Sequence, residues 1–445
     1  MSQVVVVGGG IAGLSAARDL VLAGHEVVVL EASAEAGGKL RRREVAGVLV
    51  DVGAEAMLAR RPEGLDLAAA VGVELVHPTT ASAAIWTGGV LRSLPRSLMG
   101  VPLDLDQLEE SGILSDDGLA RVRREPGLPA TILTDDISVG DLVDRRFGSE
   151  VTDLLVEPLL GGVYAGHARE ISARAAVPQL VRFAERGSML EQAAALPSTF
   201  DPAAPVFAGV AGGMSGLAEG LVRALVEHGG FTLRTGETVR ELGRHDGAYV
   251  LTLGPTTAPE RLRADAVVLA TPAAPTARLL AGLAPVAAAE LARIESASVV
   301  VVTLAFRAAD APELAATTRS GFLVPPVDGR RIKASTFSFA KWDWVRDAGR
   351  SEDGDLLLLR TSLGRHREEL ALQAPDAELV ATSLADLRAA VGLAARPVDT
   401  HVQRWGGALP QYPPGHLERV ARIRADLERV PGLVVCGAAY DGVGI

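Results

Sequence analysis

The sequence predicts an α/β fold with three parts: a parallel-sheet domain, a second domain built on an antiparallel sheet, and a mainly helical insertion. The run Val4 to Val7 is apolar and β-branched, which is typical of a parallel strand buried on both faces. Successive strand-like runs between residues 296 and 361 indicate the antiparallel sheet. Short helical periods interrupted by prolines, from residue 95 to about 175, indicate the insertion.

The opening segment reads as strand, glycine turn, helix and second strand. Gly8, Gly10 and Gly13 form the pattern G-x-G-x-x-G directly after the first strand, and Gly24 ends the helix. These glycines allow a tight turn, close approach of the backbone to a pyrophosphate, and close packing of helix on strand. The helix N-terminus favours the phosphate charge. The segment therefore predicts a Rossmann-like dinucleotide-binding unit.

A carboxylate follows the second strand. Glu31 comes directly after the apolar run Val27 to Leu30, and 18 residues after Gly13. A carboxylate at this position accepts hydrogen bonds from the ribose hydroxyls of adenosine and repels a 2′-phosphate. NADP is therefore disfavoured.

The next motifs favour FAD over NAD. Gly37-Gly38-Lys39 and the segment Val48 to Met57 resemble the FAD-dependent amine oxidase and protoporphyrinogen oxidase superfamily, in which both segments reach the flavin. A cation beside a pyrophosphate, and glycine where backbone approaches a ligand, agree with that resemblance. The alternative is that Lys39 to Arg43 is only a solvated run of charge.

The segment Glu157 to Leu180 is similar to one that runs through the porphyrinogen oxidases. We expect Gly161 to Gly166 to form a compact turn, with Gly162, Tyr164 and Ala165 against a flat macrocycle. The alternative is a corner between helix and loop, with Tyr164 packed in the core.

Two segments near the C-terminus, Val402 to His416 and Leu433 to Ile445, also resemble the porphyrinogen oxidases. The resemblance implies that Trp405 lies against the isoalloxazine and that Gly442 to Ile445 face its ribityl and pyrimidine end. The family pattern continues beyond this point into a helix directed at the cofactor, and its absence would weaken flavin binding. We also expect a strand ending near Val239 to contact adenine.

The resemblance sets the expected domains and cofactor contacts. We expect the FAD-binding domain at residues 1–80, 206–280 and 401–445, the substrate domain at 81–94 and 290–400, and the helical insertion at 95–190. The residues expected to contact FAD are Gly8, Gly9, Gly10, Ile11, Ala12, Gly13, Glu31, Ala32, Gly38, Lys39, Gly53, Ala54, Glu55, Ala56, Val239, Trp405, Gly437, Gly442, Val443, Gly444 and Ile445.

The chemistry implied by the resemblance belongs to the flavin, so we expect no catalytic side chain. A porphyrinogen would give hydride to flavin N5, and oxygen would reoxidise the flavin with release of hydrogen peroxide. The segment from Glu157 looks most like the coproporphyrinogen III oxidases of Gram-positive bacteria, which act in haem biosynthesis, with protoporphyrinogen IX oxidase as the alternative. Arginine holds carboxylates well, so the candidates for binding the substrate propionates are Arg60, Arg61, Arg92 and Arg96.

Other classes stay open on sequence alone. A flavin amine oxidase or a desaturase would share the N-terminal unit, and a carrier of the GDP-dissociation-inhibitor type would keep the glycine turn without catalysis. The formal charge of −11 disfavours a nucleic-acid partner. We expect no metal site, no transmembrane segment and, from the single cysteine Cys436, a cytoplasmic location, while contact with a membrane surface stays open.

Overall fold

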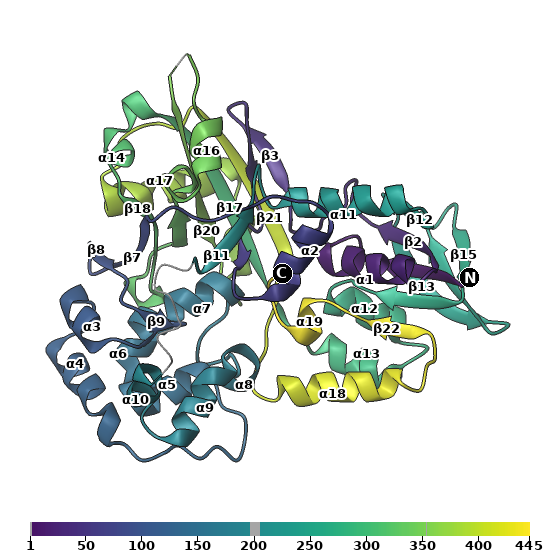
Figure 1. Cartoon of the computed structure of the whole chain (residues 1–445), viewed down its shortest axis with the longest axis horizontal. Coiled ribbons are helices and arrows are strands. Elements are labelled where there is room, and N and C mark those ends of the chain that lie inside the picture. Colours follow the sequence, from purple (N-terminus) through teal and green to yellow (C-terminus); the bar gives the residue numbers. More distant parts are fainter. Residues whose placement is uncertain (1, 196–204, 353) are drawn as a thin grey trace.

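The computed structural model describes residues 2–195, 205–352 and 354–445. The chain forms three parts that meet near its C-terminus: a parallel sheet with its helices, a long antiparallel sheet, and a group of short helices (Figure 1). This arrangement confirms the predicted fold class.

The parallel sheet has five strands in the order β12-β2-β1-β16-β22. Their bounds are β1 (Gln3–Val7), β2 (Glu26–Glu31), β12 (Phe231–Thr235), β16 (Ala266–Leu269) and β22 (Leu433–Val435). Strand β1 pairs in parallel with β2 on one side and with β16 on the other. The strand order therefore reverses at the end of β1, which is where open α/β sheets bind ligands.

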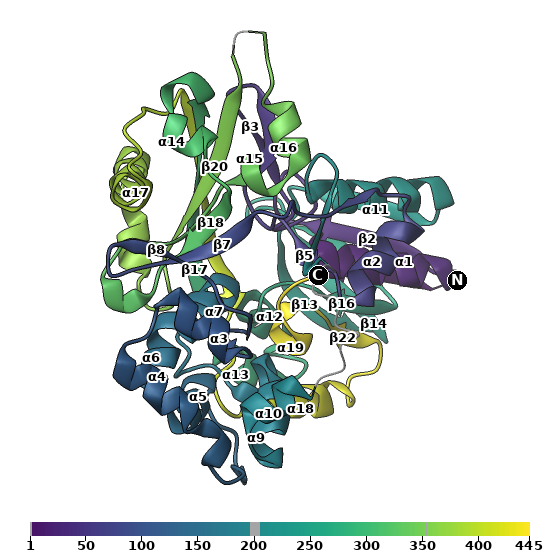
Figure 2. The same cartoon turned by 60° about the vertical axis from the view of Figure 1, so that its left-hand side comes forward.

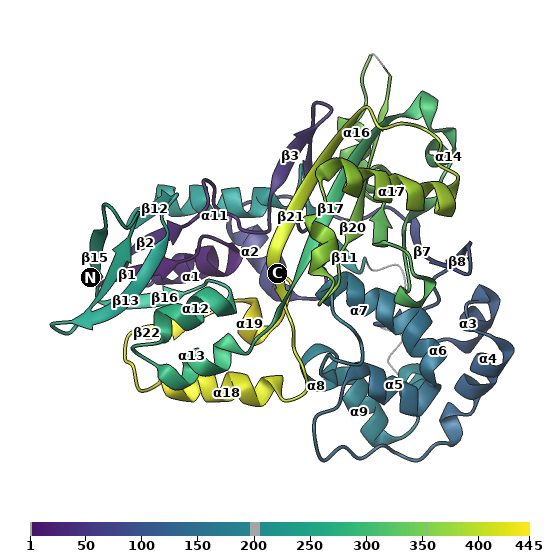
Figure 3. The same ribbon diagram turned by 180° about the vertical axis from the view of Figure 1, so that it is seen from behind.

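Both faces of this sheet are covered, as the apolar run of β1 predicts. Val4 and Val6 pack in a core with helices α1 (Ile11–Leu22) and α11 (Ser215–His228), whereas Val5 and Val7 face the opposite core. The opposite layer combines a three-stranded sheet with helices (Figure 3). It contains β13 (Val239–His245), β14 (Ala248–Leu253), β15 (Glu260–Ala264), α12 (Ala273–Leu280), α13 (Pro285–Ala292) and α18 (His416–Leu427).

Several short elements connect this part to the rest of the chain. They are β3 (Arg42–Val45), β4 (Val48–Asp51), β5 (Met57–Leu58), α2 (Pro62–Ala70), β6 (Leu75–Val76), β11 (Phe207–Val210) and α19 (Ala438–Asp441). One expectation here is wrong: Val239 begins strand β13, whereas we expected a strand to end there. The sequence prediction also missed the whole sheet β13-β14-β15.

The antiparallel sheet has seven strands in the order β21-β17-β20-β19-β18-β7-β8, with only β18 and β7 parallel. The strands are β7 (Ser82–Thr87), β8 (Val90–Ser93), β17 (Ser296–Arg307), β18 (Arg319–Leu323), β19 (Ile332–Thr336), β20 (Leu356–Leu363) and β21 (Asp399–Pro410). Strand β21 pairs with β17. The expected boundary at residue 401 therefore differs from the structure, because this strand belongs to the antiparallel sheet until Pro410.

Helices cover one face of this sheet, including α14 (Pro312–Ala315) and α17 (Asp376–Val391). Two further helices, α15 (Ser338–Lys341) and α16 (Asp343–Ala348), lie between β19 and β20 in the chain. They place Lys341 and Trp342 beside the segment that follows β4. The antiparallel sheet is thereby joined to the N-terminal part.

The helical part follows β8 and has its own apolar core. It contains β9 (Ser97–Leu98), β10 (Val101–Pro102), α3 (Leu105–Ser111), α4 (Asp116–Arg123), α5 (Val139–Phe147), α6 (Ser149–Val151), a π-helix (Thr152–Val156), α7 (Glu157–Tyr164), α8 (Ala173–Ala176), α9 (Pro178–Arg186) and α10 (Met189–Ala194). The expected compact turn at Gly161 to Gly166 is wrong in its first half, because α7 continues to Tyr164. Helix α7 lies beneath the antiparallel sheet (Figure 2).

Candidate active site

The glycine turn after β1 exposes the first amides of α1. The helix begins after Gly10, and no side chain caps it. The amides of Ile11 and Ala12 thus lie at a helix N-terminus with no side chain to satisfy them, which favours an anion. A Cβ at Gly13 would lie 1.9 Å from the carbonyl oxygen of Gly8, so only glycine lets α1 pack this closely on the turn.

Glu31 closes the other side of the turn. Its carboxylate accepts hydrogen bonds from the backbone N–H of Gly9 at 2.7 Å and from the N–H of Ser33 at 2.8 Å. The backbone carbonyl of Glu31 accepts from the N–H of Glu237 at 2.9 Å. That contact brings the chain just before Val239 beside Glu31, while Ala32 is exposed at the same edge.

The turn Gly37-Gly38-Lys39 lies directly against the first glycine turn. The N–H of Gly37 donates to the carbonyl of Gly9 at 2.8 Å, and a Cβ at Gly38 would lie 3.1 Å from the Cα of Gly10. Lys39 lies at the surface, and partial burial of its ammonium lowers its pKa. In the described residues, its ammonium has no ion-pair partner.

Gly53 is enclosed by the next turn and by Trp405. A Cβ there would lie 2.0 Å from the carbonyl oxygen of Lys39 and 3.0 Å from the Trp405 ring. The N–H of Ala54 donates to that same Lys39 carbonyl at 3.0 Å, and the indole of Trp405 donates to the carbonyl of Val52 at 3.0 Å. The structure therefore brings Lys39, Gly53 and Trp405 together, although they come from distant parts of the sequence.

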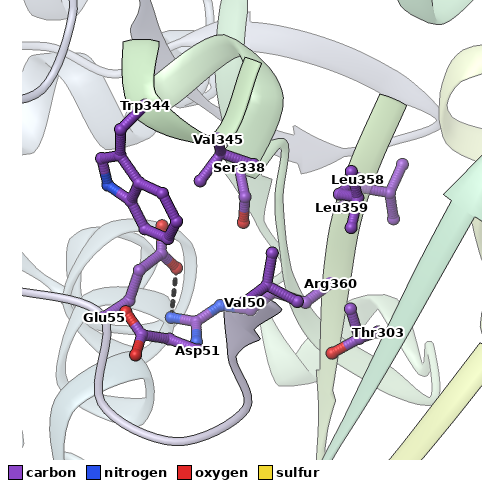
Figure 4. Close-up of a pocket in the computed structure, with 10 residues that line it drawn as sticks. All are labelled: Val50, Asp51, Glu55, Thr303, Ser338, Trp344, Val345, Leu358, Leu359 and Arg360. Carbon is purple, nitrogen blue, oxygen red and sulfur yellow. Dashed lines mark ion pairs between the residues drawn. The ribbon is translucent and has the colours of Figure 1, made fainter. Parts of the chain in front are cut away.

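The side chain of Glu55 turns into a buried ionic cluster. Its carboxylate pairs with Arg360 (Figure 4). It also pairs with Lys341 and accepts the indole N–H of Trp342. Burial favours the neutral acid, but the two cations and the indole outweigh that effect and lower the pKa of Glu55. The role expected of Glu55 at the cofactor can thus involve only its backbone, and the adjacent Ala56 packs beside the buried Trp342.

A second acid, Asp51, shares this cluster. Both of its carboxylate oxygens accept the backbone N–H of Met214, at 3.0 and 2.9 Å, which holds the turn that precedes α11. Burial raises the pKa of Asp51 to about 7, against the opposing effect of the Met214 hydrogen bond and Arg360. The cavity beside these acids measures about 10 Å³, which is enough for about one water. A macrocycle must therefore bind elsewhere.

The C-terminal segment returns to the glycine turn. A Cβ at Gly437 would lie 3.8 Å from Ala12, at the start of α1. Val443 packs against the core of the helical part, and Ile445 lies beside α2. Gly442 and Gly444 are exposed between these contacts.

Helix α7 faces both the solvent and the antiparallel sheet. Gly162 is exposed, and a Cβ there would meet Leu323 of β18 at 3.7 Å. Ala165 ends the helix in a left-handed conformation, with φ of 49°, and packs beside Val299 of β17. Tyr164 is buried and packs edge-on against Tyr412 at 5.6 Å. The alternative that Tyr164 is a core residue therefore describes its side chain better than a wall against substrate.

The arginines proposed for substrate carboxylates do not gather at one place. Arg92 lies against Gly112, and the backbone N–H of Arg96 donates to Gln107, so both lie beside α3. Arg60 is exposed and follows β5, away from α3 in the sequence. Within the described ranges, no contact joins Arg60 to Arg92 or Arg96.

Two buried cations that the sequence analysis passed over lie much closer to α7. Lys333 and Arg365 are each 4% exposed, and they come from β19 and from the segment after β20. The scarcity of lysine offered a signal, because the chain contains only Lys39, Lys333 and Lys341. One of these three lysines lies in a strand-like run, where a buried lysine is unusual.

Comparison with known proteins decides the family. The family model for flavin-containing amine oxidoreductases matches residues 11–445 of the chain. The chain belongs to this family. The prediction of an FAD-dependent oxidoreductase is confirmed, and the non-catalytic carrier is not supported.

Individual members of the flavin-containing amine oxidoreductase family are similar over almost the whole chain. Coproporphyrinogen III oxidase of Mycobacterium tuberculosis is 38% identical, over 99% of this chain and 93% of the relative. Human protoporphyrinogen oxidase is 27% identical, over 99% of this chain and 95% of the relative. A crystal structure of a protein assigned as a protoporphyrinogen oxidase, from Exiguobacterium sp. 255-15, matches with a TM-score of 0.86 at 29% identity, covering 100% and 95% of the two chains.

The residues of this flavoprotein fit an FAD at the end of β1. The start of α1 has uncapped amides for a diphosphate, and Glu31 is placed at the edge of the turn. Gly38 and Gly10 approach so closely that a side chain on Gly38 would press on the turn. Across the described residues, no helix has both the length and the apolar character needed to span a membrane.

Proposed function

We propose that this flavoprotein oxidises coproporphyrinogen III to coproporphyrin III in haem biosynthesis, with oxygen as electron acceptor and hydrogen peroxide as the second product. The observation that carries the proposal is the 38% identity to a coproporphyrinogen III oxidase over 99% of the chain. We assign Gly162, which is exposed on α7, to the surface against which the flat substrate lies.

When bound, FAD supplies the two-electron oxidation of the substrate. The protein holds and orients the reactants. We assign the diphosphate to the amides of Ile11 and Ala12, and the adenosine ribose to Glu31. We assign the flavin ring to the loop around Gly53 and the ring of Trp405, which contact each other. No side chain in this scheme has to transfer a proton to the substrate.

Protoporphyrinogen IX is the second candidate substrate. It is favoured by the 27% identity to human protoporphyrinogen oxidase and by the Exiguobacterium structure. The higher identity to a coproporphyrinogen III oxidase places it second. The two substrates differ in their number of carboxylates. The cationic side chains that bind these carboxylates are therefore expected to discriminate between the two substrates.

Turnover of both porphyrinogens tests the proposal. Purified protein reconstituted with FAD is mixed with each porphyrinogen under air, and porphyrin fluorescence, oxygen consumption and peroxide are recorded together. We expect a higher kcat/KM for coproporphyrinogen III, and one peroxide formed for each oxygen consumed. A higher kcat/KM for protoporphyrinogen IX would reverse the substrate assignment, and turnover without oxygen consumption would exclude oxygen as the acceptor.

The cytoplasmic location also stays a proposal. Its support is chemical: Cys436 is the only cysteine of the sequence, which suits a reducing compartment. Burial raises the pKa of this thiol to about 11, so it is expected to resist oxidation.

A further inference from the structure

Lys333 is a buried cation without a counter-charge in contact. Its side chain lies in β19 and is 4% exposed. Within the described part of the chain, its ammonium makes neither a hydrogen bond nor an ion pair. Burial, together with the neighbouring charge of Arg365, lowers the pKa of Lys333 to about 7. A buried ammonium without a partner is costly, and lysine is almost never fully buried unless it is paired.

Arg365 adds a second buried cation at the same place. Among the residues described, its guanidinium donates one hydrogen bond, to the carbonyl of Val324 at 3.1 Å. The acids that act on the two cations, Glu368 and Glu157, do so only through space. Glu368 is exposed, and Glu157 is engaged by the N–H of Ala168 at 2.9 Å. Lys333 and Arg365 therefore place two positive charges side by side, and no carboxylate of the described residues contacts either of them.

Both cations lie where the antiparallel sheet meets α7. The carbonyl of Lys333 accepts the N–H of Val324 at 2.9 Å, so Lys333 and Arg365 flank the end of β18. The residue after Arg365 donates its N–H to the carbonyl of Ala165 at 2.6 Å, directly at the end of α7. Helix α7 contacts both β18 and β19. Figure 2 shows α7 below the antiparallel sheet. The cation pair thus lies beside the end of α7, the helix that carries the exposed Gly162.

We propose that Lys333 and Arg365 form a carboxylate-binding site that anchors one propionate of the porphyrinogen. The proposal rests on the function proposed above. A carboxylate placed between the two cations would supply the missing counter-charge, and in a site with little water such a contact is strong. The pair would position the macrocycle by one of its edges, so we regard these as positioning residues.

A matched pair of variants tests the site. Lys333→Met removes the charge and keeps the length, while Arg331→Gln removes an exposed charge two residues away on the same segment. The probe is coproporphyrin III, and its Kd for the FAD-loaded protein is measured by fluorescence titration. We expect Lys333→Met to weaken binding by about tenfold or more, and Arg331→Gln to leave it unchanged. KM for coproporphyrinogen III is expected to rise more than kcat falls.

Thermal stability separates a binding role from a structural one. An unpaired buried ammonium destabilises the folded state, so Lys333→Met is expected to raise Tm. Because the folded-state pKa is lowered to about 7, the lysine costs stability as pH falls from its unfolded pKa and most below about 7. The gain in Tm should therefore be larger at pH 6 than at pH 9. A lower Tm in Lys333→Met would mark the lysine as structural and overturn the proposal.

The wild-type protein provides a measurement that needs no variant. Carboxylate binding should favour charged Lys333, so the affinity for coproporphyrin III should fall as pH rises through about 7. The other charged groups that act on this lysine are Arg365 and Glu368. A flat profile between pH 6 and 9 would count against the site.

Failure of this site and failure of the proposed function give different results. Protein that binds coproporphyrin III through Lys333 but oxidises neither porphyrinogen would reject the reaction and keep the site. Protein that oxidises coproporphyrinogen III, with Lys333→Met binding as tightly as wild type, would reject the site alone. Wild-type protein that neither binds nor oxidises these compounds would reject both.

Discussion

Gly53 has no room for a side chain. Replacement by alanine would place a Cβ 2.0 Å from the carbonyl oxygen of Lys39 and 3.0 Å from the Trp405 ring. We expect Gly53→Ala to displace this loop, to destabilise the protein by on the order of 2–3 kcal/mol, and to release FAD during gel filtration. Gly282→Ala is the control, because its Cβ would meet no atom within 4 Å; equal FAD retention by both variants would contradict the prediction.

Asp51 should make stability depend on pH. Burial raises its pKa to about 7 in the folded state, so the folded protein binds this proton more tightly than the unfolded chain. Its contribution is therefore favourable at low pH and is lost as pH rises toward 7. Asparagine can still accept the N–H of Met214 but does not titrate. The Tm of Asp51→Asn relative to wild type is expected to increase between pH 5 and pH 8, and parallel pH profiles would refute this assignment.

At the scale of elements, a buried ion pair organises the helical part. Glu125, which follows α4, is 0% exposed, and Arg146 of α5 is 1% exposed. The two side chains form an ion pair. The Glu125 carboxylate also accepts the hydroxyl of Ser188 at 2.6 Å and the N–H of Met189 at 2.8 Å, at the start of α10. One carboxylate thus joins two helices of this part.

Removing the buried charge of Glu125 should lower the stability of the protein far more than removing an exposed charge. We expect Glu125→Gln to destabilise the protein by about 3–5 kcal/mol, because Arg146 would stay buried without its partner. The exposed pair Arg123–Glu109 is the control, and Arg123→Gln should cost less than about 1 kcal/mol. Urea denaturation followed by circular dichroism measures the stability of both variants. Similar denaturation midpoints for the two would show that the buried pair stabilises the protein no more than the exposed pair does.

At the scale of the whole molecule, Arg360 joins the antiparallel sheet to the loop at Gly53, which we assign to the flavin site. Its guanidinium donates to the carbonyl of Gly53 at 2.8 Å and pairs with Glu55. Arg360→Gln is expected to weaken FAD binding by about tenfold, since the loop loses its support and Glu55 loses its main counter-charge. FAD affinity is measured by flavin fluorescence during titration.

The control for Arg360 is an exposed arginine of the same sheet region. Arg350 pairs with Asp347 at the surface, where both side chains are more than half exposed. Arg350→Gln is expected to bind FAD as wild type does. Unchanged affinity in Arg360→Gln as well would show that the loop holds its shape without the guanidinium.

Local sequence patterns predicted much of the fold. The unit from β1 to Glu31 was predicted because its strand, turn, helix and acid lie close together in the chain. The sheet β13-β14-β15 was missed. Its outer strands carry many charged residues, because one face of this small sheet is exposed, and that weakens the apolar pattern.

Part of the candidate site was predicted because its residues are also close together in the sequence. Gly9, Glu31 and Lys39 lie within one short stretch, and the structure keeps them together. The arginines suggested for substrate carboxylates stay a prediction, because sequence gives no measure of which surface each one reaches. Arg92 and Arg96 lie beside α3, whereas the charge of Arg61 acts on Tyr164 of α7. Tyr164 was ambiguous, since a buried tyrosine and a pocket tyrosine can occupy the same pattern.

The sequence by itself determined the dinucleotide turn and its acid, because these follow from spacing along the backbone. Only the tertiary structure decided that Glu55 is neutralised by Arg360 and that Lys333 lies unpaired beside Arg365. The physical reason is that burial and charge pairing depend on which distant strands become neighbours. Strand β20 brings Arg360 to the carbonyl of Gly53, and the segment after β20 brings Arg365 to the carbonyl of Val324. The residues next to each arginine in the sequence do not indicate these neighbours.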